Sequence, residues 1–140
     1  MNKSASSNSS REAMTAADVR RAIVRIAHEI VERNHGVEGL AIVGLQRGGT
    51  WLAEEIVAQI NNIEKEVKVP VGALDVSLHR DDIGLRPVSL GAISNIPFDL
   101  SGATVVVVDD VLYTGRTVRA AMEGLNNYGR PRAVQLAVLI

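Results

Sequence analysis

The sequence contains no cysteine, which excludes disulfide bonds and thiolate metal sites. Aromatic residues make up only 3% of its 140 residues, so few rings are present on which nucleic-acid bases could stack. The formal net charge of -1 gives no overall attraction to nucleic acid or to an anionic membrane. No apolar run is long enough to span a bilayer, and the first ten residues lack the apolar core of a signal peptide.

These absences leave a soluble, cytoplasmic globular protein as the expectation. Hydrophobic residues make up 46% of the sequence, enough for one domain with a substantial core. We expect a disordered tail over residues 1–14 and a single folded domain over residues 15–140.

The order of the predicted elements favours an α/β fold. A capping box of Thr15 and Asp18 predicts the start of the first helix, and Gly36 is expected to end it in a left-handed conformation. The other expected elements are a strand over 40–44, a helix over 50–60, a strand in the second half of 67–79, a long excursion over 80–96, a strand over 105–108, a helix with the apolar face Val118, Ala121, Met122 and Leu125, and a buried parallel strand over 133–140. This alternation predicts a mostly parallel sheet with helices on both faces.

The most informative segment runs from Val105 to Thr117 and reads VVVVDDVLYTGRT. Four β-branched residues predict a strand buried on both faces, and two carboxylates follow at its carboxyl end, where open α/β sheets bind ligands. The turn over 114–117 brings two hydroxyls, a glycine and an arginine to the start of a helix, as phosphate sites do. Carboxylates bind vicinal hydroxyls strongly, so the segment predicts a site for a sugar phosphate.

This segment resembles the phosphoribosyl pyrophosphate (PRPP) motif of type I phosphoribosyltransferases. Its DDVLYTGRT resembles the family of bifunctional pyrimidine operon regulators and uracil phosphoribosyltransferases, as do residues 74–82, 129–131 and 135–139. The resemblance implies the type I fold, a mostly parallel sheet flanked by helices with a flexible hood loop. It also implies that the domain is C-terminally incomplete, which places uracil transfer by this chain in question. Purine-transferring relatives usually carry Asp at the position of Tyr113, which argues against a purine substrate.

The resemblance also implies roles for individual residues. Asp109 and Asp110 would bind the ribose hydroxyls, and Thr114, Gly115, Arg116 and Thr117 the 5-phosphate. Residues 46–49 resemble the pyrophosphate loop, although the family often has Thr-Arg-Gly or Thr-Gly-Gly there. Arg80 falls in the hood. The implied catalytic residues are Arg47, Arg80, Asp109 and Asp110. The implied PRPP-binding residues are Gln46, Arg47, Gly48, Gly49, Arg80, Val105, Val106, Val107, Val108, Asp109, Asp110, Val111, Leu112, Tyr113, Thr114, Gly115, Arg116 and Thr117.

The implied reaction converts uracil and PRPP to UMP and pyrophosphate, with Mg²⁺ bound mainly through PRPP and no protein ligand identified. The alternative is an RNA-binding transcription attenuator that binds PRPP or nucleotide and has little or no transferase activity. Arginines that could contact pyrimidine-operon mRNA are interspersed with acids, so an ordinary solvated helix face explains them about as well; they are Arg20, Arg21, Arg25, Arg130 and Arg132. A homo-oligomer could assemble a basic surface that one chain lacks.

Overall fold

The computed structural model describes residues 15–46, 48–76, 94–110 and 115–139, with only the backbone of residues 115–117. Its helices are α2 (Ala16–Arg33), α3 (Gly48–Ile63), α5 (Gly115–Leu125) and the short 3₁₀ helix η3 (Asn126–Tyr128). Its strands are β1 (Leu40–Leu45), β2 (Val71–Leu74), β3 (Thr104–Asp109) and β4 (Ala133–Val138). No helix in these described ranges is long and apolar enough to cross a membrane.

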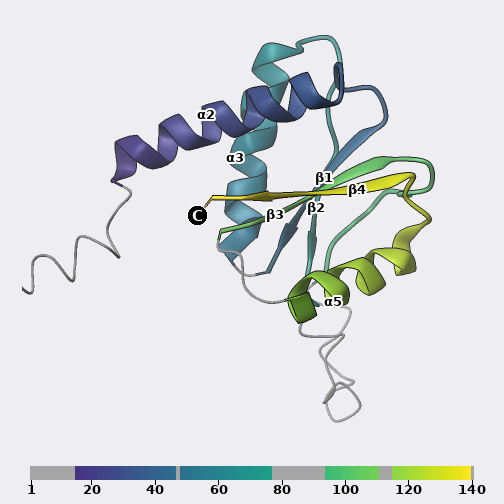
Figure 1. Cartoon of the computed structure of the whole chain (residues 1–140). Coiled ribbons are helices and arrows are strands. Elements are labelled where there is room, and N and C mark those ends of the chain that lie inside the picture. The colour runs from purple at the N-terminus through teal and green to yellow at the C-terminus, as the bar shows by residue number, and fades with distance from the viewer. Residues whose placement is uncertain (1–14, 47, 77–93, 111–114, 140) are drawn as a thin grey trace, which may run out of the picture.

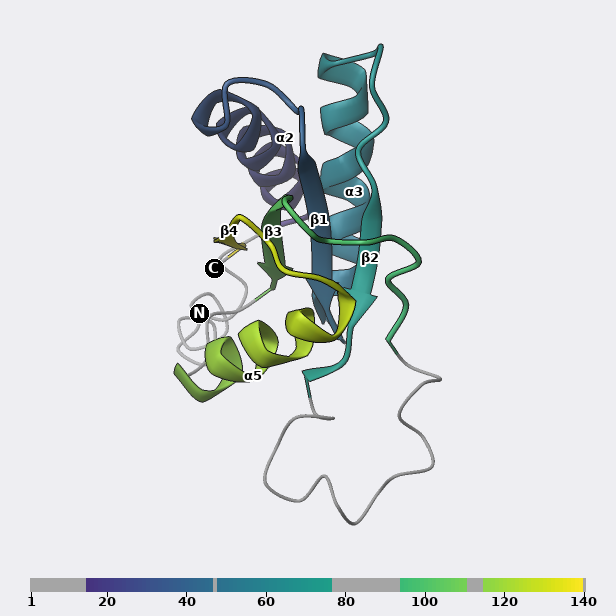
Figure 2. The ribbon, with the colours of Figure 1, turned by 90° about the vertical axis from the view of Figure 1, so that its right-hand side faces the viewer.

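The four strands form a parallel sheet in the order β2-β1-β3-β4. The chain first steps from β1 to β2 and then crosses back to place β3 on the other side of β1 (Figures 1 and 2). The strand order therefore reverses between β1 and β3. The predicted α/β class and parallel sheet are confirmed.

Alternating side chains of the central strands divide the core into two layers. Ile42, Val106 and Val108 pack with α2 and α3 on one face of the sheet. Val105 and Val107 pack with α5 on the other face. Figure 1 shows α2 and α5 on opposite sides of β4. A strand with both faces covered needs apolar residues at every position, which explains the unbroken valine run.

The start of α2 agrees with the sequence, but its end differs by one residue. The Thr15 side chain accepts a hydrogen bond from the Asp18 backbone N–H, and the Asp18 carboxylate accepts one from the Thr15 N–H. At the other end, the left-handed residue after the cap is His35, with a φ of 56°, and Gly36 follows at 123°. The Gly36 N–H donates to Val31 O, and the His35 N–H to Glu32 O, the two bonds of a Schellman motif.

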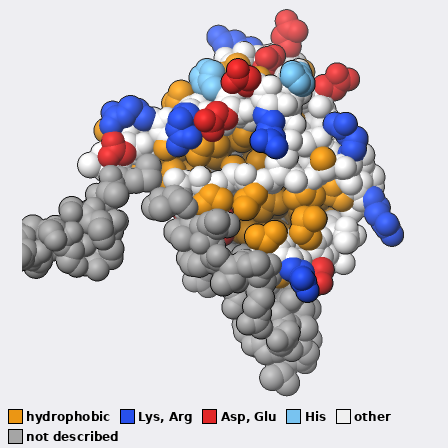
Figure 3. Space-filling model, viewed as in Figure 1, with side chains coloured by type: hydrophobic (Ala, Val, Ile, Leu, Met, Phe, Trp, Pro, Cys, Tyr) orange, Lys and Arg blue, Asp and Glu red, His pale blue; other side chains and the backbone are white. Residues whose placement is uncertain are grey.

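Two predicted apolar surfaces are wrong in part. β4 was expected to be buried, but it pairs only with β3 among the described strands, and Leu136 is 46% exposed. On α5, Ala121 and Leu125 are buried as predicted, whereas Val118 and Met122 are exposed. Figure 3 shows hydrophobic side chains on the side of the molecule where β4 and α5 lie in Figure 1. An apolar run indicates that burial is possible, but the neighbouring elements decide whether it occurs.

The strand predicted in the second half of 67–79 lies earlier, at Val71–Leu74. Asp75, a polar residue that alternates with Leu74 and Val76, is buried. Residues 77–93, most of the predicted excursion, lie outside the described residues. Its end returns beside β2, where Ala73 and Asn95 exchange two backbone hydrogen bonds in an antiparallel bridge.

Candidate active site

The candidate site lies where β1 and β3 end side by side. Gly44 of β1 is in register with Val108 of β3, so the loop after β1 and the acids after β3 leave the sheet at the same level. Open α/β sheets bind ligands at this edge, where the strand order reverses. The fold therefore brings together two predicted segments that are about sixty positions apart in the sequence.

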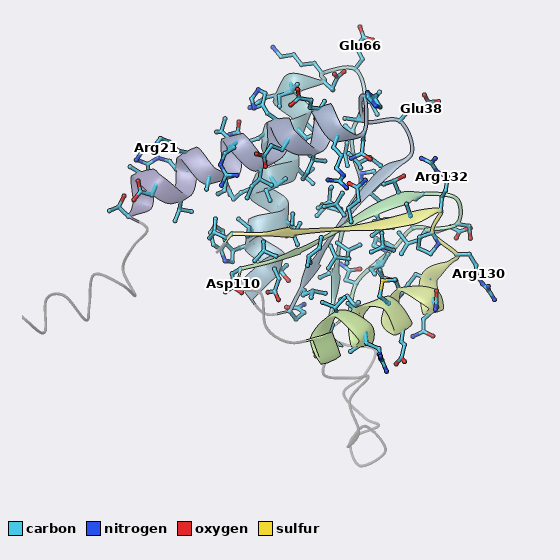
Figure 4. The ribbon with its side chains drawn as sticks, viewed as in Figure 1. Arg21, Glu38, Glu66, Asp110, Arg130 and Arg132 are labelled. Carbon is cyan, nitrogen blue, oxygen red and sulfur yellow. The ribbon has the colours of Figure 1, made fainter. Side chains whose placement is uncertain are left out.

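The two acids differ in their surroundings. Asp109 is buried, and its Oδ1 accepts a hydrogen bond of 2.9 Å from the backbone N–H of Asp110. Asp110 is partly exposed and lies near the first turn of α3 (Figure 4). Asp109 is thus held in place by its own neighbour, while the carboxylate of Asp110 lies against Gly48 at the start of α3.

Three glycines allow the first turn of α3 to approach the ends of the strands. A β carbon at Gly48 would lie 2.1 Å from Oδ2 of Asp110. One at Gly49 would lie 2.2 Å from the backbone oxygen of Val108, and one at Gly44 would lie 2.4 Å from the oxygen of Gly49. At Gly44 and Gly49 the near atoms belong to the backbone, so no side chain fits there, whereas at Gly48 they belong to the Asp110 side chain, which can rotate away. These close approaches place the predicted pyrophosphate loop against the acids.

The amino ends of two helices lie toward the carboxyl edge of the sheet, because α3 follows β1 and α5 follows β3 in the chain. The first N–H groups of a helix have no partner within the helix and carry partial positive charge, which favours anions. In the first turn of α3, Thr50 has a buried Oγ1 without a hydrogen-bond partner in the described part of the chain. Two helix ends that favour anions thus lie at the edge that carries the two carboxylates, an arrangement that suits a sugar with phosphate groups at two positions.

Asp75 is a residue at this edge that the sequence did not single out. It follows β2, whose last residue, Leu74, is in register with Leu45, and its backbone N–H donates to Ser94 Oγ at 3.0 Å. The backbone N–H of Gln46 donates to Leu74 O at 2.8 Å, which links this strand end to the predicted pyrophosphate loop. The sequence signal for Asp75 is an acid that alternates with the apolar residues Leu74 and Val76. The same alternation is typical of a solvent-facing residue, so it does not mark Asp75 as part of a site.

The structure describes part of the predicted site set. Gln46, Gly48, Gly49, Asp109 and Asp110 lie together at this edge. The side chains of residues 105–108 are buried in the two core layers and support the site from within the sheet. Arg47, Arg80 and residues 111–114 lie outside the described residues, as do the side chains of 115–117. All these roles remain predictions.

The geometry of the sheet edge agrees with comparisons to known proteins. The family described as phosphoribosyl transferase domain matches residues 12–140. The bifunctional protein PyrR of Roseiflexus sp. (strain RS-1) is 56% identical over 131 residues, covering 93% of this chain and 71% of that protein. The chain belongs to the PyrR family of phosphoribosyltransferases. This membership confirms the family resemblance read from the PRPP motif.

Further family comparisons support both the sequence and the fold. The bifunctional protein PyrR of Brevibacillus brevis is 55% identical over 130 residues, covering 91% of this chain. The chain spans about 71% of the length of both PyrR relatives. The crystal structure of a purine phosphoribosyltransferase from Pyrococcus horikoshii Ot3 superposes with a TM-score of 0.62 over 89% of this chain and 74% of that one, at 24% identity. At that identity, the structure supports the fold alone.

Proposed function

We propose that this chain is a uracil phosphoribosyltransferase that also regulates pyrimidine biosynthesis genes. The observation that carries the enzymatic part is the contact between Gly48 and Asp110. It brings the carboxylate of Asp110, one of two adjacent acids suited to ribose hydroxyls, against the amino end of α3, suited to a pyrophosphate. Membership of the PyrR family supports the pyrimidine substrate and the regulatory role.

In the proposed reaction, a ring nitrogen of uracil forms a bond to the anomeric carbon of PRPP. The bond from that carbon to the pyrophosphate oxygen breaks, pyrophosphate leaves with the electron pair, and the uracil nitrogen loses its proton. Asp109 and Asp110 orient the ribose through its hydroxyls, and the first turn of α3 stabilises the negative charge on the leaving group. No protein nucleophile is needed. The amino end of α5 receives the 5-phosphate.

The described residues fit a magnesium ion that is held mainly by the substrate. Within them, no group of three His, Asp or Glu side chains could hold a metal by itself. Mg²⁺ commonly binds one or two carboxylates together with substrate phosphates. Asp109 and Asp110 are the carboxylates of the predicted site at this edge, and the ion would neutralise charge on the pyrophosphate.

The proposed regulatory role requires contact with pyrimidine-operon mRNA, in the cytoplasm where nascent mRNA is found. The arginines of α2 are partly engaged, because Arg21 pairs with Asp18 and Arg25 pairs with Glu29 at 3.3 Å. Arg130 and Arg132 precede β4, at the end of the sheet opposite Asp110 (Figure 4). RNA bound there would not compete for the sugar-phosphate site. A homo-oligomer would gather such arginines from several copies.

The test combines activity and binding. Purified protein should form UMP from uracil and PRPP with magnesium, and calorimetry should detect PRPP binding. A band shift with a pyrimidine-operon leader RNA, weakened by added salt, should report the regulatory role. PRPP binding without UMP formation would favour the attenuator without transferase activity. Failure to bind PRPP would refute the proposed enzyme.

A further inference from the structure

The contact between Asp110 and α3 has a consequence for how the site takes up its substrate. The β carbon of a helical residue points toward the amino end of its helix. The Asp110 carboxylate lies where the β carbon of Gly48 would be, with 2.1 Å from that position to Oδ2 and 2.7 Å to Oδ1. Gly48 is the first residue of α3. A carboxylate therefore lies against the first residue of α3, beside the helix end where the leaving pyrophosphate is expected.

We propose that Asp110 occupies the anion position at the amino end of α3 in the free protein, and that the pyrophosphate of PRPP displaces it. This exchange rests on the proposed function and deepens it. The same helix end attracts both groups, because its partial positive charge favours any nearby anion. A carboxylate and a pyrophosphate at one position would collide and repel, so they exclude one another.

The displaced carboxylate has a second role available. Asp110 directly follows Asp109, whose buried carboxylate is fixed by the Asp110 N–H. This bond anchors the backbone of Asp110, so its side chain can turn away from α3 without movement of the strand. Pyrophosphate binding would thus release Asp110 toward the ribose hydroxyls. Gly48 is the positioning residue, because only a residue without a side chain admits the carboxylate.

The proposed displacement of Asp110 predicts that Asp110→Asn has opposite effects on the binding of PRPP and of inorganic pyrophosphate. Asp110→Asn should weaken PRPP binding, because a ribose contact loses its charge. The same variant should bind inorganic pyrophosphate about fivefold more tightly than wild type, because the competing charge is gone. Pyrophosphate affinity is measured by calorimetry with excess EDTA, so that no metal bridges the anion and the carboxylates. Unchanged melting temperatures show that the variants are folded.

Two controls separate displacement from simple repulsion. Asp109→Asn removes the same charge from the adjacent residue, keeps an oxygen to accept the Asp110 N–H, and should change pyrophosphate affinity less than about twofold. In a Gly48→Ala background, the methyl group already excludes the Asp110 carboxylate. The effect of Asp110→Asn should then shrink below about twofold, as measured by a double-mutant cycle.

The outcomes are distinct. Tighter pyrophosphate binding by Asp110→Asn alone, lost in the Gly48→Ala background, supports the exchange. An unchanged affinity, an equal gain in Asp109→Asn, a gain that persists with Gly48→Ala, or no pyrophosphate binding by any variant would overturn it. Failure of wild type to bind PRPP with magnesium refutes the proposed function instead, since the pyrophosphate series uses neither PRPP nor metal.

Discussion

Gly49→Ala tests whether the close approach of α3 to β3 is required by the fold. The new β carbon would lie 2.2 Å from the backbone oxygen of Val108 and 3.1 Å from the Cα of Asp109. These are atoms of a central strand and cannot move independently. Overpacking of this kind typically costs about 1–3 kcal/mol. Replacing a helical glycine by alanine returns up to about 1 kcal/mol in propensity. We expect a net loss of roughly 1–2 kcal/mol.

Gly48→Ala is the matched control, because it makes the same chemical change one residue earlier in α3. Its β carbon would meet the carboxylate of Asp110, which is the end of a side chain that can rotate away. We therefore expect its stability to stay within about 0.5 kcal/mol of wild type, as for substitutions without a core clash.

Urea unfolding followed by circular dichroism measures both variants. With a slope of about 2 kcal/mol per molar urea, the midpoint of Gly49→Ala should fall by roughly 0.5–1 M, and that of Gly48→Ala should barely change. Equal midpoints for Gly49→Ala and wild type would refute the proposed packing of the loop on β3. An equal loss of stability in both variants would show that the Val108 backbone and the Asp110 side chain yield equally to the added methyl group, contrary to the reasoning above.

The remaining predictions concern the acids, a helix cap and pH. Asp109→Asn combined with Asp110→Asn should abolish PRPP binding in calorimetry with little change in the circular dichroism spectrum; retained affinity would contradict their ribose role. Thr15→Ala should lower the free energy of unfolding by about 1 kcal/mol, because α2 loses its capping hydroxyl, and an unchanged urea midpoint would count against the cap. Backbone N–H groups of Thr15 and Ser101 lower the pKa of the Asp18 and Asp99 carboxyls, respectively, below 3.8. Because both are lowered in the folded state, their stabilisation is present above the unfolded value and is lost as the pH falls through the folded one. The stability difference between wild type and Asp18→Asn, measured in urea, should therefore shrink below about pH 4, and a constant difference from pH 6 to pH 3 would contradict the shift.

Local signals in the sequence predicted the elements that depend on nearby residues. The capping box of Thr15 and Asp18 formed as expected, because its two hydrogen bonds join residues three apart. The valine run became the central strand β3, since four β-branched residues suit burial on both faces. The end of α2 was one residue off, because His35 adopted the left-handed conformation that Gly36 was expected to take.

Signals that depend on distant neighbours could not be read correctly. The run over 133–138 has the composition of a buried strand, yet β4 pairs with β3 alone in the described part of the sheet and leaves Leu136 half exposed. Asp75 alternates with apolar residues as a solvent-facing residue would, but it is buried in the structure, where the chain returns beside it at Ser94 and Asn95. In both cases, burial is decided by segments far away in the sequence.

The sequence by itself determined the family of this protein and the residue types available at its candidate site. The apolar run before Asp109 and Asp110, the threonine-glycine turn after them and the glycine loop at 48–49 predict a sugar-phosphate site and indicate the family that the comparisons confirm, because these signals depend on residue types at short spacing. Only the tertiary structure decided that the glycine loop and the acids meet. That contact results from the strand order, which sets β1 beside β3, and from glycines that let α3 approach within the space a side chain would fill. Contacts between distant segments are set by the packing of the whole sheet, which no short stretch of sequence encodes.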